Sequence, residues 1–188
     1  MSPRPSVSLL LIFFLASLHA ASPVDGGSTT NIIHETCKKC AHEDPNVSYE
    51  FCVASLESNP YSHCADLRGL GLISIKLLRH NMTRTRAYTE KLLQSEKMDP
   101  SVRACLQDCL ELYSDAVPTL AEAIRAYKGG RYDDANIDLS SVMDAPSTCE
   151  DGFSETGVGS PLGRRNKDAF RLSAIALSIV TMLSRASH

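Results

Sequence analysis

The stretch CKKCAHEDPNVSYEFC, residues 37–52, places a Cys-x-x-Cys pair and a third cysteine close together. This spacing is compatible with two ligands of a zinc site, with a redox dithiol, or with half of a structural cross-link. Which of the three it is decides whether the chain is a metalloprotein, an oxidoreductase or a secreted binding module.

The zinc and redox interpretations both lack the partners that they need. A structural zinc site takes four ligands, usually from a second Cys-x-x-Cys or a pair of histidines. The sequence has no second Cys-x-x-Cys, and His34 and His42 do not have the required spacing. A redox dithiol normally opens a helix that follows a strand, and strand patterns are nearly absent here. We therefore favour a structural disulfide and expect no metal.

The residues around this stretch predict a helical hairpin over residues 27–64. Apolar residues with helical spacing lie before it and in residues 49–56, and the Pro-Asn pair in its middle supplies a turn. Too few apolar residues lie here to hold a hairpin by packing alone. Cys37 and Cys52 lie on the two arms, and closing a loop of this length by a disulfide stabilises the fold by roughly 3 kcal/mol.

The N-terminus has the pattern of a secretory signal peptide over residues 1–20. Arg4 precedes the apolar run VSLLLIFFLASL, and small residues follow at Ala20 and Ala21, where cleavage is expected. The alternative is a membrane anchor, but the run is about 12 residues long and a bilayer requires roughly 20. We therefore expect a secreted protein that does not use a membrane as its partner.

The charge of the mature chain gives no reason to expect a nucleic-acid partner. The full sequence has 19 Lys+Arg and 22 Asp+Glu, and residues 1–20 contain one Arg and no acid, so the mature chain has 18 against 22 and a charge of −4. Nucleic-acid-binding domains are typically basic. The remaining length of about 168 residues, from 21 to 188, is appropriate for one domain.

All seven cysteines lie in the mature chain and enter an oxidising pathway, so disulfides are expected and at least one thiol is left over. Cys109 and Cys149 could join neighbouring helices. Cys105 lies one turn before Cys109 and is a candidate buried thiol, whereas Cys40 and Cys64 could form a third bridge. The sequons at residues 46–48 and 81–83 make Asn46 and Asn81 candidate glycosylation sites.

Residues 65–188 predict an up-and-down bundle of four helices, which makes the chain all-α. Four segments have apolar residues every three or four positions; their first and last such residues are Ile75 and Leu92, Val102 and Tyr127, Tyr132 and Phe153, and Leu172 and Met182.

Capping and breaking residues agree with these segments. Asp-Pro-Ser at residues 99–101 is typical of a helix start, and glycines at 129–130 and within 157–163 separate the later helices. Pro118 and Pro146 fall inside helical patterns, where we expect bends and not ends. The final apolar run, AIALSIVTML, is too short for a lipid anchor, so we expect a buried bundle helix.

Four segments carry a resemblance to a known family, the plant invertase and pectin methylesterase inhibitors. They are TCKKCAHEDPNVSYEFCVASL (36–56), DCLELYSDAV (108–117), YDDANIDLSSVMDAPSTCEDGF (132–153) and SPLGRRNKDAFRLSAIALSI (160–179). Their order and spacing follow the family over nearly the whole mature chain. The likeness is strongest to the invertase inhibitors that include a pollen allergen.

The resemblance implies a four-helix bundle with an N-terminal hairpin, and disulfides Cys37–Cys52 and Cys109–Cys149. It also implies a function. Family members bind a plant acid invertase (β-fructofuranosidase) in the cell wall or vacuole, or alternatively a cell-wall pectin methylesterase, and block the active-site cleft without a reaction or cofactor of their own.

The resemblance also indicates a partner-binding loop. Family invertase inhibitors have Pro-Lys-Phe in the turn after the second bundle helix, where it enters the sugar cleft; here Gly130, Arg131 and Tyr132 occupy that turn. A guanidinium could meet the acidic groups of an invertase cleft, but loss of the proline leaves the loop less preorganised. The alternative is that the glycines simply end a helix and Tyr132 begins the next core face.

Two other classes of function are less well supported. An enzyme would need a recognisable catalytic pattern, and the sequence has no Gly-x-Ser-x-Gly, no phosphate-binding glycine loop and no His-Glu-x-x-His. A lipid- or hormone-binding bundle would need an unfilled core cavity, which the many large aliphatic residues argue against.

Overall fold

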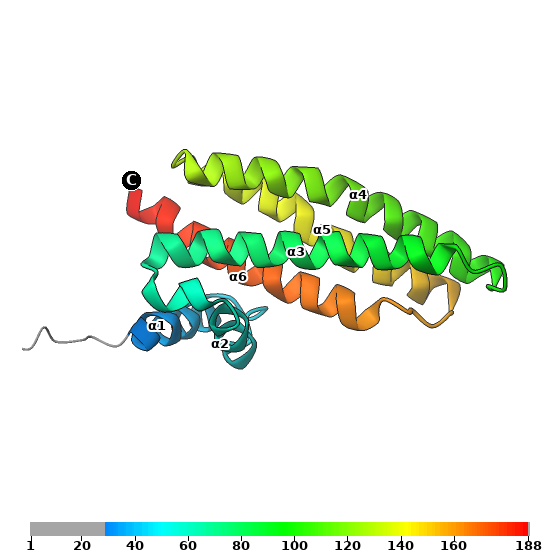
Figure 1. Cartoon of the computed structure of the whole chain (residues 1–188), viewed down its shortest axis with the longest axis horizontal. Helices are drawn as coiled ribbons and strands as arrows, with labels where there is room; N and C mark the ends of the chain where they lie inside the picture. The colour runs from blue at the N-terminus through cyan, green and yellow to red at the C-terminus, as the bar shows by residue number, and fades with distance from the viewer. Residues whose placement is uncertain (1–28, 188) are drawn as a thin grey trace, which may run out of the picture.

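The computed structural model describes residues 29–187, in which every regular element is a helix (Figure 1). Four long helices form the body of the molecule: α3 (Leu67–Leu93), α4 (Pro100–Lys128), α5 (Tyr132–Thr156) and α6 (Gly163–Ser187). The all-α class and the four-helix bundle with its N-terminal helices are thus confirmed. The predicted signal peptide lies outside the described residues.

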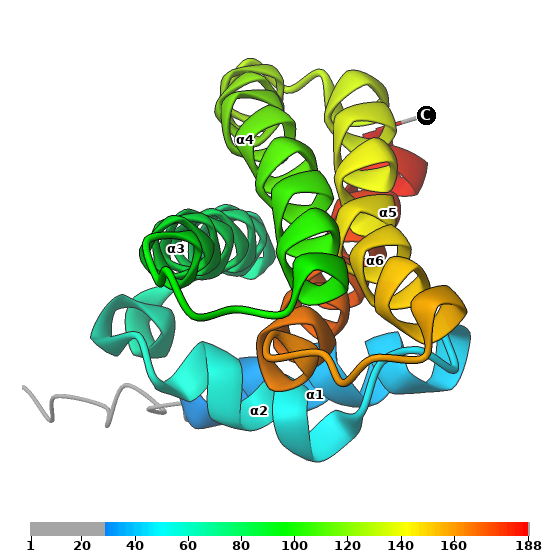
Figure 2. The same cartoon turned by 90° about the vertical axis from the view of Figure 1, so that its right-hand side faces the viewer.

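The four long helices form a closed ring. Helix α3 packs against α4, α4 against α5, α5 against α6, and α6 against α3, and Figure 2 shows this arrangement nearly end-on. The connections between consecutive helices are short, which forces each helix to run antiparallel to the one before it.

Local capping chemistry explains where the long helices begin. The side chain of Asp66 accepts a hydrogen bond from the Gly69 N–H at the start of α3. Asp99 does the same for Ser101 at the start of α4, where Pro100 occupies the first helical position. Such caps satisfy amide groups that have no partner within the helix.

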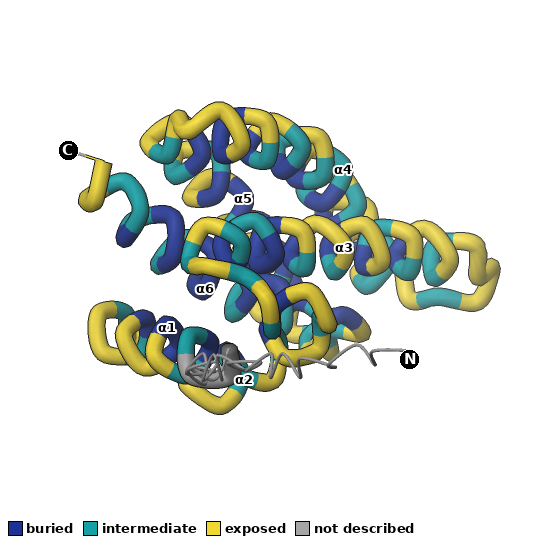
Figure 3. The backbone as a smooth tube through the Cα atoms, turned by 60° about the vertical axis from the view of Figure 1, so that its left-hand side comes forward, coloured by how far each residue is buried: buried dark blue, intermediate teal, exposed yellow. Residues whose placement is uncertain are grey.

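The bundle core lies along the inner faces of the four helices (Figure 3). Its largest fully buried side chains include Tyr113, Tyr127 and Phe153. Helices α4 and α5 continue through Pro118 and Pro146, so neither proline ends its helix, as predicted.

The N-terminal hairpin packs on the bundle through a second apolar cluster. It consists of α1 (Thr29–Glu43) and α2 (Tyr49–Glu57), followed by the 3-10 helix η1 (Pro60–Cys64). A disulfide joins Cys37 to Cys52 with their Cα atoms 5.6 Å apart. Side chains of both arms then pack against α3 and α6, so the hairpin covers one side of the bundle.

The composition of helix α6 is compatible with a membrane span and with a buried bundle helix. Its residues Gly163–Ala186 are long and apolar enough to cross a membrane by length and composition, and half of the most apolar window is buried within the bundle. In the part of the chain described, α6 contacts α3, α5 and both hairpin helices. It is a bundle helix, as the sequence predicted.

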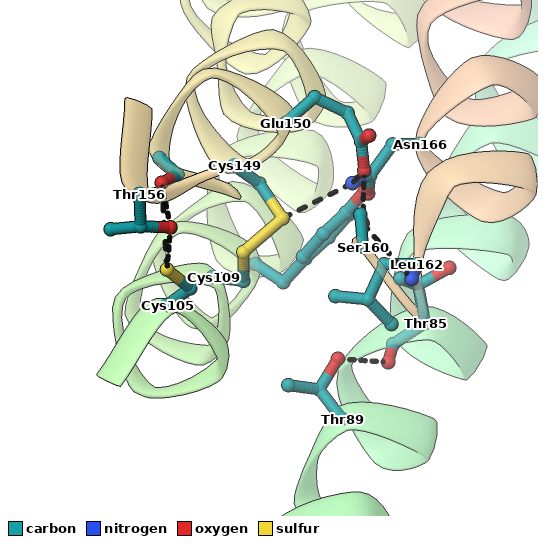
Figure 4. The surroundings of a disulfide bond; sticks show 12 residues. Thr85, Thr89, Cys105, Cys109, Cys149, Glu150, Thr156, Ser160, Leu162 and Asn166 are labelled. Carbon is teal, nitrogen blue, oxygen red and sulfur yellow. Dashed lines mark hydrogen bonds between the residues drawn. A yellow bond between two sulfur atoms is a disulfide. The ribbon is translucent and has the colours of Figure 1, made fainter. Parts of the chain in front are cut away.

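A second disulfide joins α4 to α5 beside a buried polar cluster (Figure 4). The Cα atoms of Cys109 and Cys149 are 5.0 Å apart. The buried amide of Asn166, on α6, accepts a hydrogen bond from the Tyr113 hydroxyl and donates to Glu150 and to the Cys149 sulfur. Burial raises the pKa of Tyr113, which keeps its hydroxyl protonated as a donor. This cluster ties three helices together.

The remaining cysteines are free thiols, so the possible third bridge between Cys40 and Cys64 is not formed. Cys105 is buried, as predicted, and lies 3.4 Å from the Thr156 hydroxyl. Burial, with smaller contributions from neighbouring acids, raises the pKa of the Cys40 thiol to about 12. Because Cys37 is bonded to Cys52, the Cys-x-x-Cys pair is neither a dithiol nor a pair of zinc ligands.

Replacing both Cys109 and Cys149 by alanine should lower the free energy of unfolding by about 4 kcal/mol, because the disulfide closes a loop of 40 residues. Urea denaturation measures this loss. Cys64→Ala, which removes an exposed thiol, is the control and should change stability by less than about 0.5 kcal/mol. A similar loss in both variants would contradict the role assigned to the cross-link.

Candidate functional site

The turn between α4 and α5 lies at the end of the bundle near the C-terminus (Figure 1). Its backbone is fixed by two hydrogen bonds: the Arg131 N–H donates to the Ala126 carbonyl, and the Gly130 N–H donates to the Tyr127 carbonyl, each at 3.0 Å. Gly130 has a φ of 74°, the left-handed conformation that favours glycine. This is the Schellman arrangement that ends many helices.

Arg131 is exposed and comes directly before the first residue of α5. Its Nη1 atom lies 3.6 Å from Oδ2 of Asp134, and the two side chains are 64% and 58% exposed. An ion pair this exposed contributes little to stability. The guanidinium is therefore presented to solvent and can exchange Asp134 for another carboxylate.

Tyr132 is half-buried and belongs partly to the core. Its ring packs edge-on against Tyr127, with ring centroids 5.3 Å apart. Tyr127 is buried, which raises its pKa, and its hydroxyl donates to the Arg68 carbonyl at 2.7 Å. The Arg68 guanidinium in turn donates to the Lys128 carbonyl at 3.2 Å. These contacts anchor the end of α4 to the start of α3.

Gly71 allows this close approach. A Cβ atom added at Gly71 would lie 2.2 Å from the Tyr127 hydroxyl oxygen and 3.1 Å from a side-chain carbon of Ile179. No side chain fits at this position of α3 unless Tyr127 moves, and Tyr132 packs on Tyr127. Gly71 therefore affects the position of the turn indirectly, through the contact of Tyr127 with Tyr132.

The three predicted partner-binding residues, Gly130, Arg131 and Tyr132, lie together around a shallow hollow of about 250 Å³ that Ser187 also lines. Ser184 donates a hydrogen bond to Asp133 and so fixes the end of α6 beside the start of α5. The glycines end α4, as the alternative interpretation has it, and Arg131 is exposed. Partner binding by Gly130, Arg131 and Tyr132 stays a prediction.

Sequence reasoning missed three residues that shape this turn: Asp134, Tyr127 and Gly71. The pair of Arg131 with Asp134 has helical i,i+3 spacing and could have been found from it. The contact between Gly71 and Tyr127 joins residues far apart in the chain, and no local signal indicates it.

The two predicted glycosylation sites differ in their surroundings. Asn46 is exposed in the turn between α1 and α2, and its N–H donates to the Asp44 carboxylate at 2.8 Å. Asn81 is half-buried on α3, and its side-chain oxygen is buried. Glycosylation stays a prediction, with Asn46 the more accessible of the two.

Comparison with known proteins identifies the chain with one family. The pattern of the family described as plant invertase/pectin methylesterase inhibitor matches residues 31–179. This chain belongs to that family. The resemblance drawn from the four sequence segments is confirmed, as is the conclusion that the protein is an inhibitor and not an enzyme.

Individual relatives agree with this family. A "Putative invertase inhibitor" of Platanus orientalis is 42% identical, over 93% of this chain and 95% of the relative. A "Cell wall / vacuolar inhibitor of fructosidase 2" of Arabidopsis thaliana is 30% identical over 86% and 88%. The crystal structure of a mutant pectin methylesterase inhibitor from Arabidopsis has the same fold, with a TM-score of 0.67 at 23% identity, and covers 82% of this chain and 97% of that one.

Gly130→Ala should lower the free energy of unfolding by about 1 kcal/mol, because alanine is strained at a φ of 74°. Gly129→Ala is the matched control, because Gly129 has a φ of −77°, which alanine adopts freely. The free energy of unfolding of this variant should be unchanged or slightly raised. Urea denaturation of both variants tests the turn. Equal losses would show that the positive φ of Gly130 is not the cause of the destabilisation.

Proposed function

We propose that this protein binds a plant acid invertase and blocks its active-site cleft without catalysing a reaction. The names of the Platanus and Arabidopsis relatives support an invertase target. A pectin methylesterase is the second candidate, because the family description includes such inhibitors and the matched crystal structure is one of them. The signal-peptide pattern and the Arabidopsis name support action outside the cell or in the vacuole.

The observation that carries the proposal is an exposed guanidinium on a backbone that is already fixed. Arg131 follows a Schellman turn whose two N–H groups are hydrogen-bonded to α4. The ring of Tyr132 packs edge-on against the ring of Tyr127. Although the proline of Pro-Lys-Phe is missing, these bonds restrict the turn in the free protein and reduce the entropy lost on binding.

Binding to an acidic cleft would replace one carboxylate partner by another. In the free protein Arg131 is paired with Asp134. A carboxylate in the cleft of an invertase would compete for the same guanidinium, in surroundings with less water, where charge-assisted hydrogen bonds are stronger. Asp134 would then face other acids and oppose binding.

Assaying the mature protein against an acid invertase and a pectin methylesterase side by side separates the two candidate targets. We expect invertase activity to fall with increasing inhibitor while pectin methylesterase is unaffected. Inhibition of the esterase alone would overturn the primary assignment in favour of the alternative.

Arg131→Ala should weaken invertase inhibition at least tenfold, since truncating one partner of a desolvated charge pair costs about 2 kcal/mol or more. Arg125→Ala is the matched control, because Arg125 is 64% exposed like Arg131 and is also paired at i,i+3, with Glu122. The inhibition constant of the control should not change. If both variants inhibit like the parent protein, the turn is not the contact surface.

Asp134→Asn should strengthen invertase inhibition, by up to about fivefold, because it releases Arg131 from an exposed pair worth at most about 1 kcal/mol. The amide keeps the size of the side chain and removes its charge. Titration of enzyme activity with this variant measures the change. Weaker inhibition would mean that Asp134 itself contacts the enzyme or that Arg131 must be held by it.

A further inference from the structure

A basic groove lies between α3 and α6 on the flank of the bundle, where the two packed helices diverge at the surface. It has a volume of about 620 Å³ and is also lined by residues from the end of α2. Its charged lining consists of Arg84 from α3 and Arg164, Arg165 and Asp168 from α6, and His80 of α3 also lines it. His80 and Arg84 lie four positions apart on α3, and Asp168 lies one turn after Arg164 and Arg165 on α6, so each helix presents these residues on one side.

Two of the arginines that line the groove are unpaired within the described part of the chain. Arg84 and Arg164 are exposed, and neither has an ion-pair or hydrogen-bond partner among residues 29–187. Arg165 is held by stacking, with its guanidinium carbon 4.1 Å from the centre of the Tyr88 ring. Stacking leaves the guanidinium N–H groups of Arg165 available to a ligand. The groove also receives the N-terminal turn of α6, whose helix dipole is positive at this end.

This positive groove does not follow from the charge of the whole protein, which is −3. The groove between α4 and α5 has a similar volume, about 600 Å³, and is acidic; its charged lining residues are Asp108, Glu111, Asp115, Asp151 and Glu155. The two grooves therefore carry opposite charge. Because both grooves are hollowed, the acidic groove of a second copy does not fit into the basic one.

The remaining polar lining can bond to hydroxyl groups. Ser55 has a hydroxyl with no hydrogen-bond partner among the described residues, and Ser58 next to it donates to the Ser55 carbonyl. The Asn81 side-chain oxygen accepts no hydrogen bond within the described protein.

We propose that this groove binds a short anionic oligosaccharide, a chain of uronic acid residues. Its carboxylates would pair with Arg84, Arg164 and Arg165, since guanidinium groups bind carboxylates through paired hydrogen bonds. Its hydroxyls would bond to the Ser55 hydroxyl. An acidic peptide is less favoured, because it has few hydroxyl groups to bond to the unpaired Ser55 hydroxyl.

The groove is separate from the α4–α5 turn. Its α6 residues lie in the first half of that helix, whereas Ser187, at the opposite end of α6, lines the hollow beside the turn. The saccharide and an enzyme could therefore be bound at once. The proposal does not depend on which enzyme the turn contacts, and it is tested in the absence of any enzyme.

Isothermal titration with a galacturonic acid oligomer of about six units tests the proposal. We expect binding that weakens as salt rises from about 50 to about 200 mM, because the contacts are ionic. Arg84→Gln combined with Arg164→Gln should weaken it at least tenfold. Arg125→Gln combined with Arg185→Gln removes the same charge from exposed sites elsewhere and should change the dissociation constant less than twofold. Circular dichroism confirms that each variant is folded.

Two further ligands decide the class of partner. The same oligomer fully methyl-esterified should not bind, since it has no charge. A glutamate peptide of equal length should bind at least fivefold more weakly, and Ser55→Ala should weaken only the saccharide. The proposal is wrong if the saccharide does not bind, if the two double variants lose affinity equally, or if the peptide binds as tightly.

Discussion

The disulfide between Cys109 and Cys149 holds α4 and α5 in one register, and the geometry of the α4–α5 turn depends on that register. Cys109 lies about 30 Å from Gly130 along α4 at 1.5 Å per residue, so the cross-link and the turn restrain opposite ends of the helix pair. Asn166 adds a third restraint by bonding to α4 and α5 from α6. With both ends of the helix pair restrained, sliding of the two helices is opposed, and the backbone of Arg131 is held in place while its side chain stays exposed.

The parts of the fold that the sequence predicted well are those with one buried face. Helix α4 buries a single stripe, so its apolar residues recur with helical spacing and its boundaries are visible. The start of α3 was missed because Leu70, Gly71 and the residues from Ile73 to Ile75 are all buried, between the bundle and the hairpin. A helix covered on both sides has no polar face, and its periodicity disappears.

The candidate site was predicted only in part, for physical reasons. The resemblance indicated Gly130, Arg131 and Tyr132, but the pairing of Arg131 with Asp134 depends on side-chain conformation. The contact of Gly71 with Tyr127 depends on how closely α3 and α4 approach, which no local pattern encodes. The basic groove is missed for a similar reason, since it exists only when α3 and α6 are rotated so that their cationic rows face each other.

The burial of Cys40 protects the covalent topology of the hairpin. This thiol lies one helical turn from Cys37, where a thiolate could attack the Cys37–Cys52 bond and displace one of its sulfurs. With its pKa raised to about 12 by burial, the Cys40 thiol is almost entirely protonated at neutral pH, and the thiolate is the form that attacks a disulfide. Burial thereby disfavours exchange between Cys40 and the Cys37–Cys52 bond.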